Sequence, residues 1–175
     1  MMLFLWTGPK HCGKTTAAAR LVHTARQHGF RVAGLLAPSV YRDGALVGFD
    51  ALDLRTEARA PLAVCRDNPG DVGQFHFLEE GLRLGSHTLG PAATDGADFV
   101  VVDEFGMLEL AGRGWREAVD SLVHAGKTPL VVVVRQQLVD TVRGVYANVP
   151  SVCLDAMAPE SVDEVLRSLR KDDSA

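Results

Sequence analysis

Two stretches of the chain contain residue types that could do chemistry: a glycine-rich stretch at residues 8–16 and two adjacent carboxylates at residues 103–104. The first stretch fits the pattern G-x-x-x-x-G-K-[S/T] at every fixed position. Its glycines let the backbone turn tightly, so that successive N–H groups can point into one concavity and bind an anion. The residues are Gly8, Pro9, Lys10, His11, Cys12, Gly13, Lys14 and Thr15, followed by Thr16.

The side chains of this stretch match the parts of a nucleoside triphosphate bound together with Mg²⁺. Lys14 brings a mobile positive charge for the β- and γ-phosphates, and the Thr15 hydroxyl is an oxygen ligand suited to Mg²⁺. A helix that begins here also directs its unpaired N–H groups at the phosphates. We therefore predict that residues 8–16 form a Walker A phosphate-binding loop for ATP, GTP or another nucleoside triphosphate.

The neighbouring residues supply the context that such a loop requires. Residues 3–6 form a short apolar run that is typical of a buried strand. After the loop, apolar residues recur at helical spacing, and Gly29 stands where a helix would end. These apolar residues are Ala18, Leu21, Val22 and Ala25. The order strand, glycine loop, helix argues against a glycine-rich turn that contains a lysine by chance.

The two carboxylates follow a second apolar run. Residues 99–102 are one phenylalanine and three valines, which is typical of a strand buried on both faces of a parallel sheet. Open α/β sheets bind their ligands at the carboxyl ends of the strands. We therefore expect Asp103, at such an end, to hold Mg²⁺ as the Walker B aspartate of P-loop proteins does.

The remaining pattern predicts a fold in which strands and helices alternate. Further strands are expected at residues 31–37, 129–134 and 151–154, and helices at about residues 78–93, 115–123, 138–142 and 162–169. Asp43-Gly44 predicts an antiparallel hairpin with its second strand at residues 46–54, and residues 61–65 predict a third short strand. We predict an α/β fold of the P-loop NTPase type, with three layers, a mostly parallel sheet, helices on both faces and this hairpin insertion. The insertion either extends the sheet or forms a lid that contacts the substrate.

Composition narrows the class of protein. The length predicts a single domain at residues 1–170 with a polar tail at residues 171–175. Hydrophobic residues make up 47% of the chain, and a net charge of −4 argues against a nucleic-acid partner. Three cysteines without a CxxC pair disfavour disulfide and zinc sites and favour a cytoplasmic location. No apolar run approaches the length of a membrane span, so no membrane association is expected.

At Asp103-Glu104-Phe105-Gly106, followed by Glu109-Leu110, the chain resembles the small P-loop nucleoside-triphosphatases of the thermophilic or cancer-related type. The resemblance covers nearly all of residues 3–169, because further stretches follow the family's order: Thr7-Gly8-Pro9 with Gly13-Lys14-Thr15-Thr16, Gly48-Phe49-Asp50 and Val72-Gly73-Gln74-Phe75. It implies slow, Mg²⁺-dependent hydrolysis of several nucleoside triphosphates with little base preference. It also implies that Lys14 and Thr15 bind phosphate and Mg²⁺, that Asp103 orders the metal shell, and that Glu104 activates water. Glu104 and Lys14 would be the catalytic residues.

The chain departs from the family pattern at positions that concern base recognition and a lid rather than phosphate chemistry. The family's two glutamates and arginine are replaced at Pro38, Ser39 and Tyr41, its Asn-Arg pair is replaced by Ser161-Val162, and Met107 replaces a basic residue. Two alternatives to hydrolysis remain: a kinase for nucleotides or small molecules, and a nucleotide-gated adapter without catalysis.

Three other residues have the character of structural or surface positions. Trp115 is interpreted as a core residue rather than a platform for a base. Arg113 and Arg135 are candidates for a transition-state arginine by their place in the chain, but both are interpreted as solvated surface charges. The sequence therefore assigns no transition-state arginine.

Overall fold

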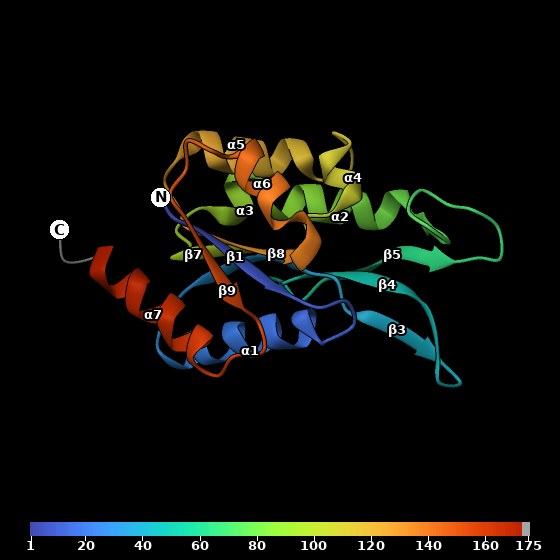
Figure 1. The fold of residues 1–175 in the computed structure, drawn as a ribbon, viewed down its shortest axis with the longest axis horizontal. Coiled ribbons are helices and arrows are strands. Elements are labelled where there is room, and N and C mark those ends of the chain that lie inside the picture. The colour runs from blue at the N-terminus through green and yellow to red at the C-terminus, as the bar shows by residue number, and fades with distance from the viewer. Residues whose placement is uncertain (173–175) are drawn as a thin grey trace.

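A nine-stranded sheet crosses the molecule between two layers of helices in the computed structural model, which describes residues 1–172 (Figure 1). The strands are β1 (Leu3–Gly8), β2 (Val32–Leu36), β3 (Ser39–Arg42), β4 (Ala45–Asp53), β5 (Arg59–Cys65), β6 (Phe75–Phe77), β7 (Phe99–Asp103), β8 (Leu130–Arg135) and β9 (Ser151–Asp155). They lie in the order β6-β5-β4-β2-β7-β8-β1-β9, and β3 pairs with β4. The neighbours from β2 to β9 in this order are parallel, whereas β3, β4, β5 and β6 are joined by antiparallel pairs.

Helices cover both faces of this sheet. They are α1 (Lys14–Gln27), α2 (Glu79–Thr88), α3 (Pro91–Thr94), α4 (Met107–Leu110), α5 (Arg116–Ala125), α6 (Val139–Val145) and α7 (Glu160–Asp172), with a 3₁₀ turn at Gln136–Leu138. One hydrophobic cluster joins the sheet to α1 and α7, and a second joins its other face to α2, α5 and α6 (Figure 1). The predicted α/β fold, mostly parallel and covered on both faces, is confirmed. No helix in the described part of the chain is long and apolar enough to cross a membrane.

The central strands are held in place by burial. Every residue of β7 is buried, as are the five apolar residues that begin β8, which fits their β-branched sequences. The register pairs Gly8 of β1 with Arg135 of β8, and Asp103 of β7 with Val133 of β8. The carboxyl ends of the three strands therefore lie side by side at one edge of the sheet.

The antiparallel insertion follows the predicted hairpin. Asp43 and Gly44 both have positive φ angles, 50° and 79°, which is the backbone conformation of a tight hairpin turn. β4 pairs with β2 on one side and with β5 on the other, so the insertion extends the main sheet. The short β6, which the sequence pattern did not predict, adds an edge strand to β5.

The helix expected at residues 78–93 is interrupted. α2 ends at Thr88 and α3 begins at Pro91, because proline disfavours a helical conformation in the residue before it and supplies no N–H to continue the helix. Gly90 accordingly has an extended backbone, with φ −69° and ψ 160°. At the other end of the chain, α7 extends through the first two residues of the predicted tail, and residues 173–175 lie outside the described residues.

Two glycines inside α2 let this helix approach its neighbours closely. A Cβ atom at Gly81 would lie 2.4 Å from the Cα atom of Leu62 in β5, and one at Gly85 would lie 2.6 Å from the ring of Trp115. Trp115 is 3% exposed, which confirms its prediction as a core residue. The glycines therefore serve packing, although glycine disfavours a helix by about 1 kcal/mol relative to alanine.

We expect Gly81→Ala to lower the free energy of unfolding by about 1–3 kcal/mol, the usual cost of overpacking. Gly144→Ala in α6 is the matched control, because a Cβ atom there would meet no described atom within 4 Å beyond its own helix. This control should instead stabilise the protein by about 0.5–1 kcal/mol. Urea denaturation of both variants checks the result. A Gly81→Ala variant as stable as the control would contradict the close packing of α2 on β5.

Candidate active site

The predicted phosphate loop lies between β1 and α1. β1 ends at Gly8 and α1 begins at Lys14, so the predicted order of strand, loop and helix is confirmed. Gly13, the residue before α1, has a φ of 94°, which lies in the left-handed region that favours glycine. Among the described residues, none caps the first turn of α1 with its side chain, and this turn contains no acidic residue. Its N–H groups can therefore bind an anion.

Lys14 is buried and its ammonium group turns back over the loop. Its Nζ atom donates hydrogen bonds to the carbonyl oxygens of Pro9 at 2.9 Å and Gly8 at 3.4 Å. These carbonyls take the place of anionic partners and hold the positive charge at the loop. A phosphate in the loop would offer this ammonium group a charged acceptor instead, and hydrogen bonds between charged groups are the stronger ones.

Thr15 and Asp103 line a cleft together, and the Thr15 hydroxyl is one of the groups that lower the pKa of the Asp103 carboxyl. The Ala37 N–H group donates to Oδ2 of Asp103 at 3.1 Å. Burial raises the pKa of Asp103 to about 7, while the Ala37 N–H group and the Thr15 hydroxyl lower it. A hydroxyl and a buried carboxylate that line the same cleft are hard oxygen donors, so these two residues fit Mg²⁺.

Glu104 lies just beyond the end of β7, so the alternation of a strand does not send it to the face opposite Asp103. Both carboxylates line the same cleft. The indole N–H of Trp115 donates to the Glu104 carbonyl oxygen at 3.2 Å, which fixes the backbone at this position. The Oε1 atom of Glu104 lies 2.8 Å from Nη2 of Arg135 and accepts a hydrogen bond from Nε at 3.0 Å.

The interpretation of Arg135 as a solvated surface charge was wrong. Its side chain is 33% exposed, pairs with Glu104 and lines the cleft. The reason is the register of the sheet, which sets the end of β8 between the ends of β1 and β7. Arg113 is more exposed and pairs with Asp71.

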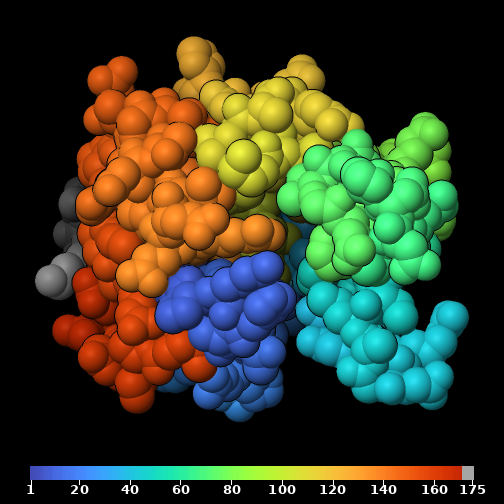
Figure 2. Space-filling model, turned by 45° about the vertical axis from the view of Figure 1, so that its right-hand side comes forward, coloured from blue at the N-terminus to red at the C-terminus, as the bar shows by residue number. Residues whose placement is uncertain are grey.

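These groups surround a cleft of about 780 Å³. Figure 2 shows the hollow between the phosphate loop (blue), the hairpin of β3 and β4 (cyan) and the segment before β6 (green). Tyr41 and Phe49 of the hairpin line it, so the insertion contributes to the cleft as well as to the sheet. The Phe49 and Phe75 rings are in contact, with centroids 4.9 Å apart. A narrower pocket of about 110 Å³ continues inward past Glu104 between largely apolar walls.

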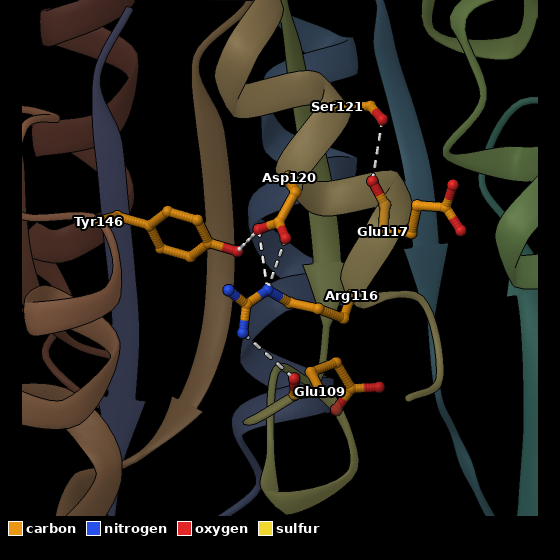
Figure 3. Close-up of polar contacts among 6 residues, drawn as sticks. All are labelled: Glu109, Arg116, Glu117, Asp120, Ser121 and Tyr146. Atoms are coloured by element: carbon orange, nitrogen blue, oxygen red, sulfur yellow. Dashed lines mark hydrogen bonds and ion pairs between the residues drawn. The ribbon is translucent and has the colours of Figure 1, made fainter. Parts of the chain in front are cut away.

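The segment that follows Glu104 is tied to α5 and α6 by Arg116 (Figure 3). Its Nε atom donates to both carboxylate oxygens of Asp120 at 2.8 Å, and Nη1 donates to the Glu109 carbonyl oxygen at 3.4 Å. The Tyr146 hydroxyl donates to the same Asp120 at 2.7 Å. The guanidinium also lies 5.9 Å and 5.8 Å from the ring centroids of Phe105 and Tyr146. This network fixes α4, and with it the position of Glu104.

Glu109 places a second carboxyl group behind Glu104. The side chain is 3% exposed, and its Oε2 atom accepts a hydrogen bond from the Gly106 N–H at 2.9 Å. Burial raises the pKa of Glu109 to about 7, although the hydrogen bond from Gly106 lowers it. Glu109 therefore closes the turn after Glu104 and lines the inner pocket as a buried acid.

Comparison with known proteins identifies the family. A family model described as NTPase matches residues 3–167. The chain belongs to this NTPase family. Nucleoside-triphosphatase THEP1 of Archaeoglobus fulgidus is 33% identical over 141 residues, which cover 78% of this chain and 81% of that protein. The protein of the same name from Methanocaldococcus jannaschii is 30% identical over 141 residues, with coverage of 80% and 81%.

A solved structure shares the fold of this NTPase family member. The solution structure of a human cancer-related nucleoside triphosphatase superposes with a TM-score of 0.72 at 21% identity, covering 99% of this chain and 98% of that one. The resemblance to the small P-loop nucleoside-triphosphatases is thereby confirmed by family and by fold.

The sequence motifs of the NTPase family come together in the cleft, but Arg135 was interpreted as a surface charge and Glu109 was given no role beyond the resemblance. Arg135 could have been predicted from the rule that the strand ends of an open sheet line the ligand site, because Arg135 ends an apolar run as Asp103 does. Apart from the resemblance at Glu109-Leu110, no local signal indicated the burial of Glu109, which depends on packing by Gly106, Gly114 and Trp115.

The raised pKa of Glu109 predicts a pH-dependent stability. The carboxyl titrates near 4.5 when unfolded and at about 7 when folded, so between these values the folded state holds the extra proton. Stability from this group is therefore present below pH 4.5 and is lost as the pH rises through 7. Relative to Glu109→Gln, we expect the wild type to lose about 3 kcal/mol between pH 4.5 and pH 8.

Denaturant unfolding at a series of pH values measures this difference. Glu117→Gln, at an exposed position of α5, is the control for exchanging a carboxyl for an amide. A difference between wild type and Glu109→Gln that stays constant with pH would contradict the prediction.

Proposed function

We propose that the chain hydrolyses nucleoside triphosphates to the diphosphate and phosphate, with Mg²⁺ as cofactor and little preference for the base. One observation carries this proposal: Lys14, Thr15, Asp103 and Glu104 all line a single cleft. The first three would hold the triphosphate and its metal. The fourth is a carboxylate that can accept a proton from water. The family relatives named nucleoside-triphosphatase support the same reaction.

The phosphates would bind through the backbone as well as through Lys14. The N–H groups of residues 10–16, which include the first turn of α1, would bind phosphate oxygens, and Lys14 would exchange the loop carbonyls for β- and γ-phosphate oxygens. Mg²⁺, held by Thr15 and Asp103, would neutralise charge on the β- and γ-phosphates. None of these contacts involves the base, which supports a broad base preference.

Glu104 would act as the general base. A water molecule in the inner pocket attacks the γ-phosphorus and gives one proton to the Glu104 carboxylate, so that a new P–O bond forms. The bond between the γ-phosphorus and the β–γ bridging oxygen breaks, and its electron pair stays on the diphosphate. The aromatic wall of Phe49 and Phe75 limits the bulk water at this point.

A carboxylate in this position favours hydrolysis over the two alternatives. A kinase must keep water from the γ-phosphate, and a nucleotide-gated adapter needs no general base. We expect slow turnover, about 10⁻⁴ to 10⁻² s⁻¹, as in P-loop proteins without an arginine from a partner. The three free cysteines fit a cytoplasmic location, where thiols stay reduced.

Lys14→Ala should weaken ATP and GTP binding together, because the ammonium group faces the phosphates that both nucleotides share. Isothermal titration of each nucleotide with Mg²⁺ measures the effect, and we expect a loss of about tenfold or more. Lys127→Ala is the control, since Lys127 is an exposed lysine that does not line the cleft. Unchanged affinity for both nucleotides in Lys14→Ala would refute the assignment of the phosphate loop.

Glu104→Gln tests the proposed function itself. The amide keeps the shape of the side chain but cannot accept a proton from water, so phosphate release from ATP should fall by about two orders of magnitude or more. Binding of Mg²⁺-ATP should remain near that of the wild type. Asp103→Asn is the comparison, because it should instead raise the Mg²⁺ concentration needed for activity. Hydrolysis by Glu104→Gln at the wild-type rate would favour the adapter.

A further inference from the structure

Arg135 occupies a position between the two halves of the candidate site. It ends β8, where the register sets it beside Gly8, the first residue of the phosphate loop. On the other side of β8, Val133 pairs with Asp103 of β7, and Glu104 follows directly. The guanidinium of Arg135 therefore lies at the sheet edge between the phosphate loop and the two carboxylates.

The partner of Arg135 in the structure is Glu104. Both its Nε and its Nη2 atoms contact the same oxygen, Oε1, at 3.0 Å and 2.8 Å. About one third of each side chain is exposed, and the exposed part faces the cleft that contains Lys14 and Thr15. Arg135 is thus a cation at hydrogen-bond distance from the carboxylate that would activate water.

We propose that Arg135 binds the γ-phosphate and stabilises the transition state in cis, after exchanging its contact with Glu104 for phosphate oxygens. This inference rests on the proposed function and adds the group that stabilises the charge of the transferring phosphoryl group. It assigns to the chain itself the arginine that many P-loop enzymes receive from a partner.

The exchange follows from charge and geometry. A γ-phosphate carries more negative charge than a carboxylate, and its oxygens match the planar fork of a guanidinium in bidentate contacts. When Arg135 turns to the phosphate, Oε1 of Glu104 loses two hydrogen-bond donors and can accept the proton of the attacking water. One movement therefore supplies positive charge at the γ-phosphate and frees the base only when a triphosphate is bound.

Three other cations near the cleft, Arg59, Lys14 and Arg113, are less suited to this role. Arg59 lines the cleft but is 56% exposed and pairs with Asp50 on the sheet insertion. Lys14 belongs to the phosphate loop and contacts its carbonyls. Arg113 pairs with Asp71 and does not line the cleft described above. Arg135 alone among these four touches Glu104.

The first experiment measures ATP turnover by Arg135→Ala, Arg135→Lys and the control Arg113→Ala. Arg135→Ala should lower kcat by about 20-fold or more, the ratio between P-loop proteins with and without an arginine in cis. Arg135→Lys should recover part of the loss, because it restores the charge without the fork. Arg113→Ala should keep wild-type turnover. Turnover by Arg135→Ala that equals or exceeds that of the wild type would overturn the proposal.

The second experiment separates binding of the γ-phosphate from support of Glu104. In the Glu104→Gln background, Arg135→Ala should weaken ATP affinity by about tenfold and leave ADP affinity unchanged, with or without Mg²⁺. Equal effects on ATP and ADP, or no effect on either, would show that Arg135 only supports Glu104. Thermal unfolding confirms that each variant is folded. If the wild type releases no phosphate from ATP, the proposed function fails. The binding comparison would still show whether Arg135 contacts the γ-phosphate.

Discussion

The parallel pairing of β1, β8 and β7 is the constraint on which the candidate site depends. Their register sets the phosphate loop, Arg135 and the two carboxylates at the same edge of the sheet. The strands are almost entirely buried between two hydrophobic clusters, so a slip by one residue would move each side chain to the wrong cluster. Apolar packing therefore sets the distances between the charged groups, and the polar contacts at the edge adjust to it.

The parts of the fold that local signals specify could be predicted from the sequence. The phosphate loop needs only the glycine and lysine spacing, and the hairpin turn needs only the positive φ angles that Asp43 and Gly44 adopt readily. The runs of β7 and β8 are strands because their β-branched residues are buried on both faces. The roles of Lys14, Thr15 and Asp103 came from the same local patterns and from resemblance, and their positions in one cleft fit those roles.

The parts that depend on contacts between distant segments could not be predicted. The partner of Arg135 follows from the strand order β7-β8-β1, which no short stretch of sequence contains. The break between α2 and α3 was signalled by Gly90-Pro91, but the apolar spacing on either side suggested one continuous helix. The burial of Glu109 arises from the turn at Gly106 and from the packing of Trp115 behind it. An acid on a short helix would otherwise be expected in solvent.

The charges of the cleft explain how an acidic site can accept a triphosphate. Asp103, Glu104 and Glu109 gather near its inner end, and two of them have pKa values raised mainly by burial. A further anion would be repelled unless cations turned towards it. Lys14 contacts the loop carbonyls and Arg135 contacts Glu104, so both cations are already positioned at the cleft. Because a diphosphate would reach the loop and Lys14 but would leave the contact of Arg135 with Glu104 undisturbed, we infer that the site distinguishes the triphosphate by its terminal phosphate rather than by its base.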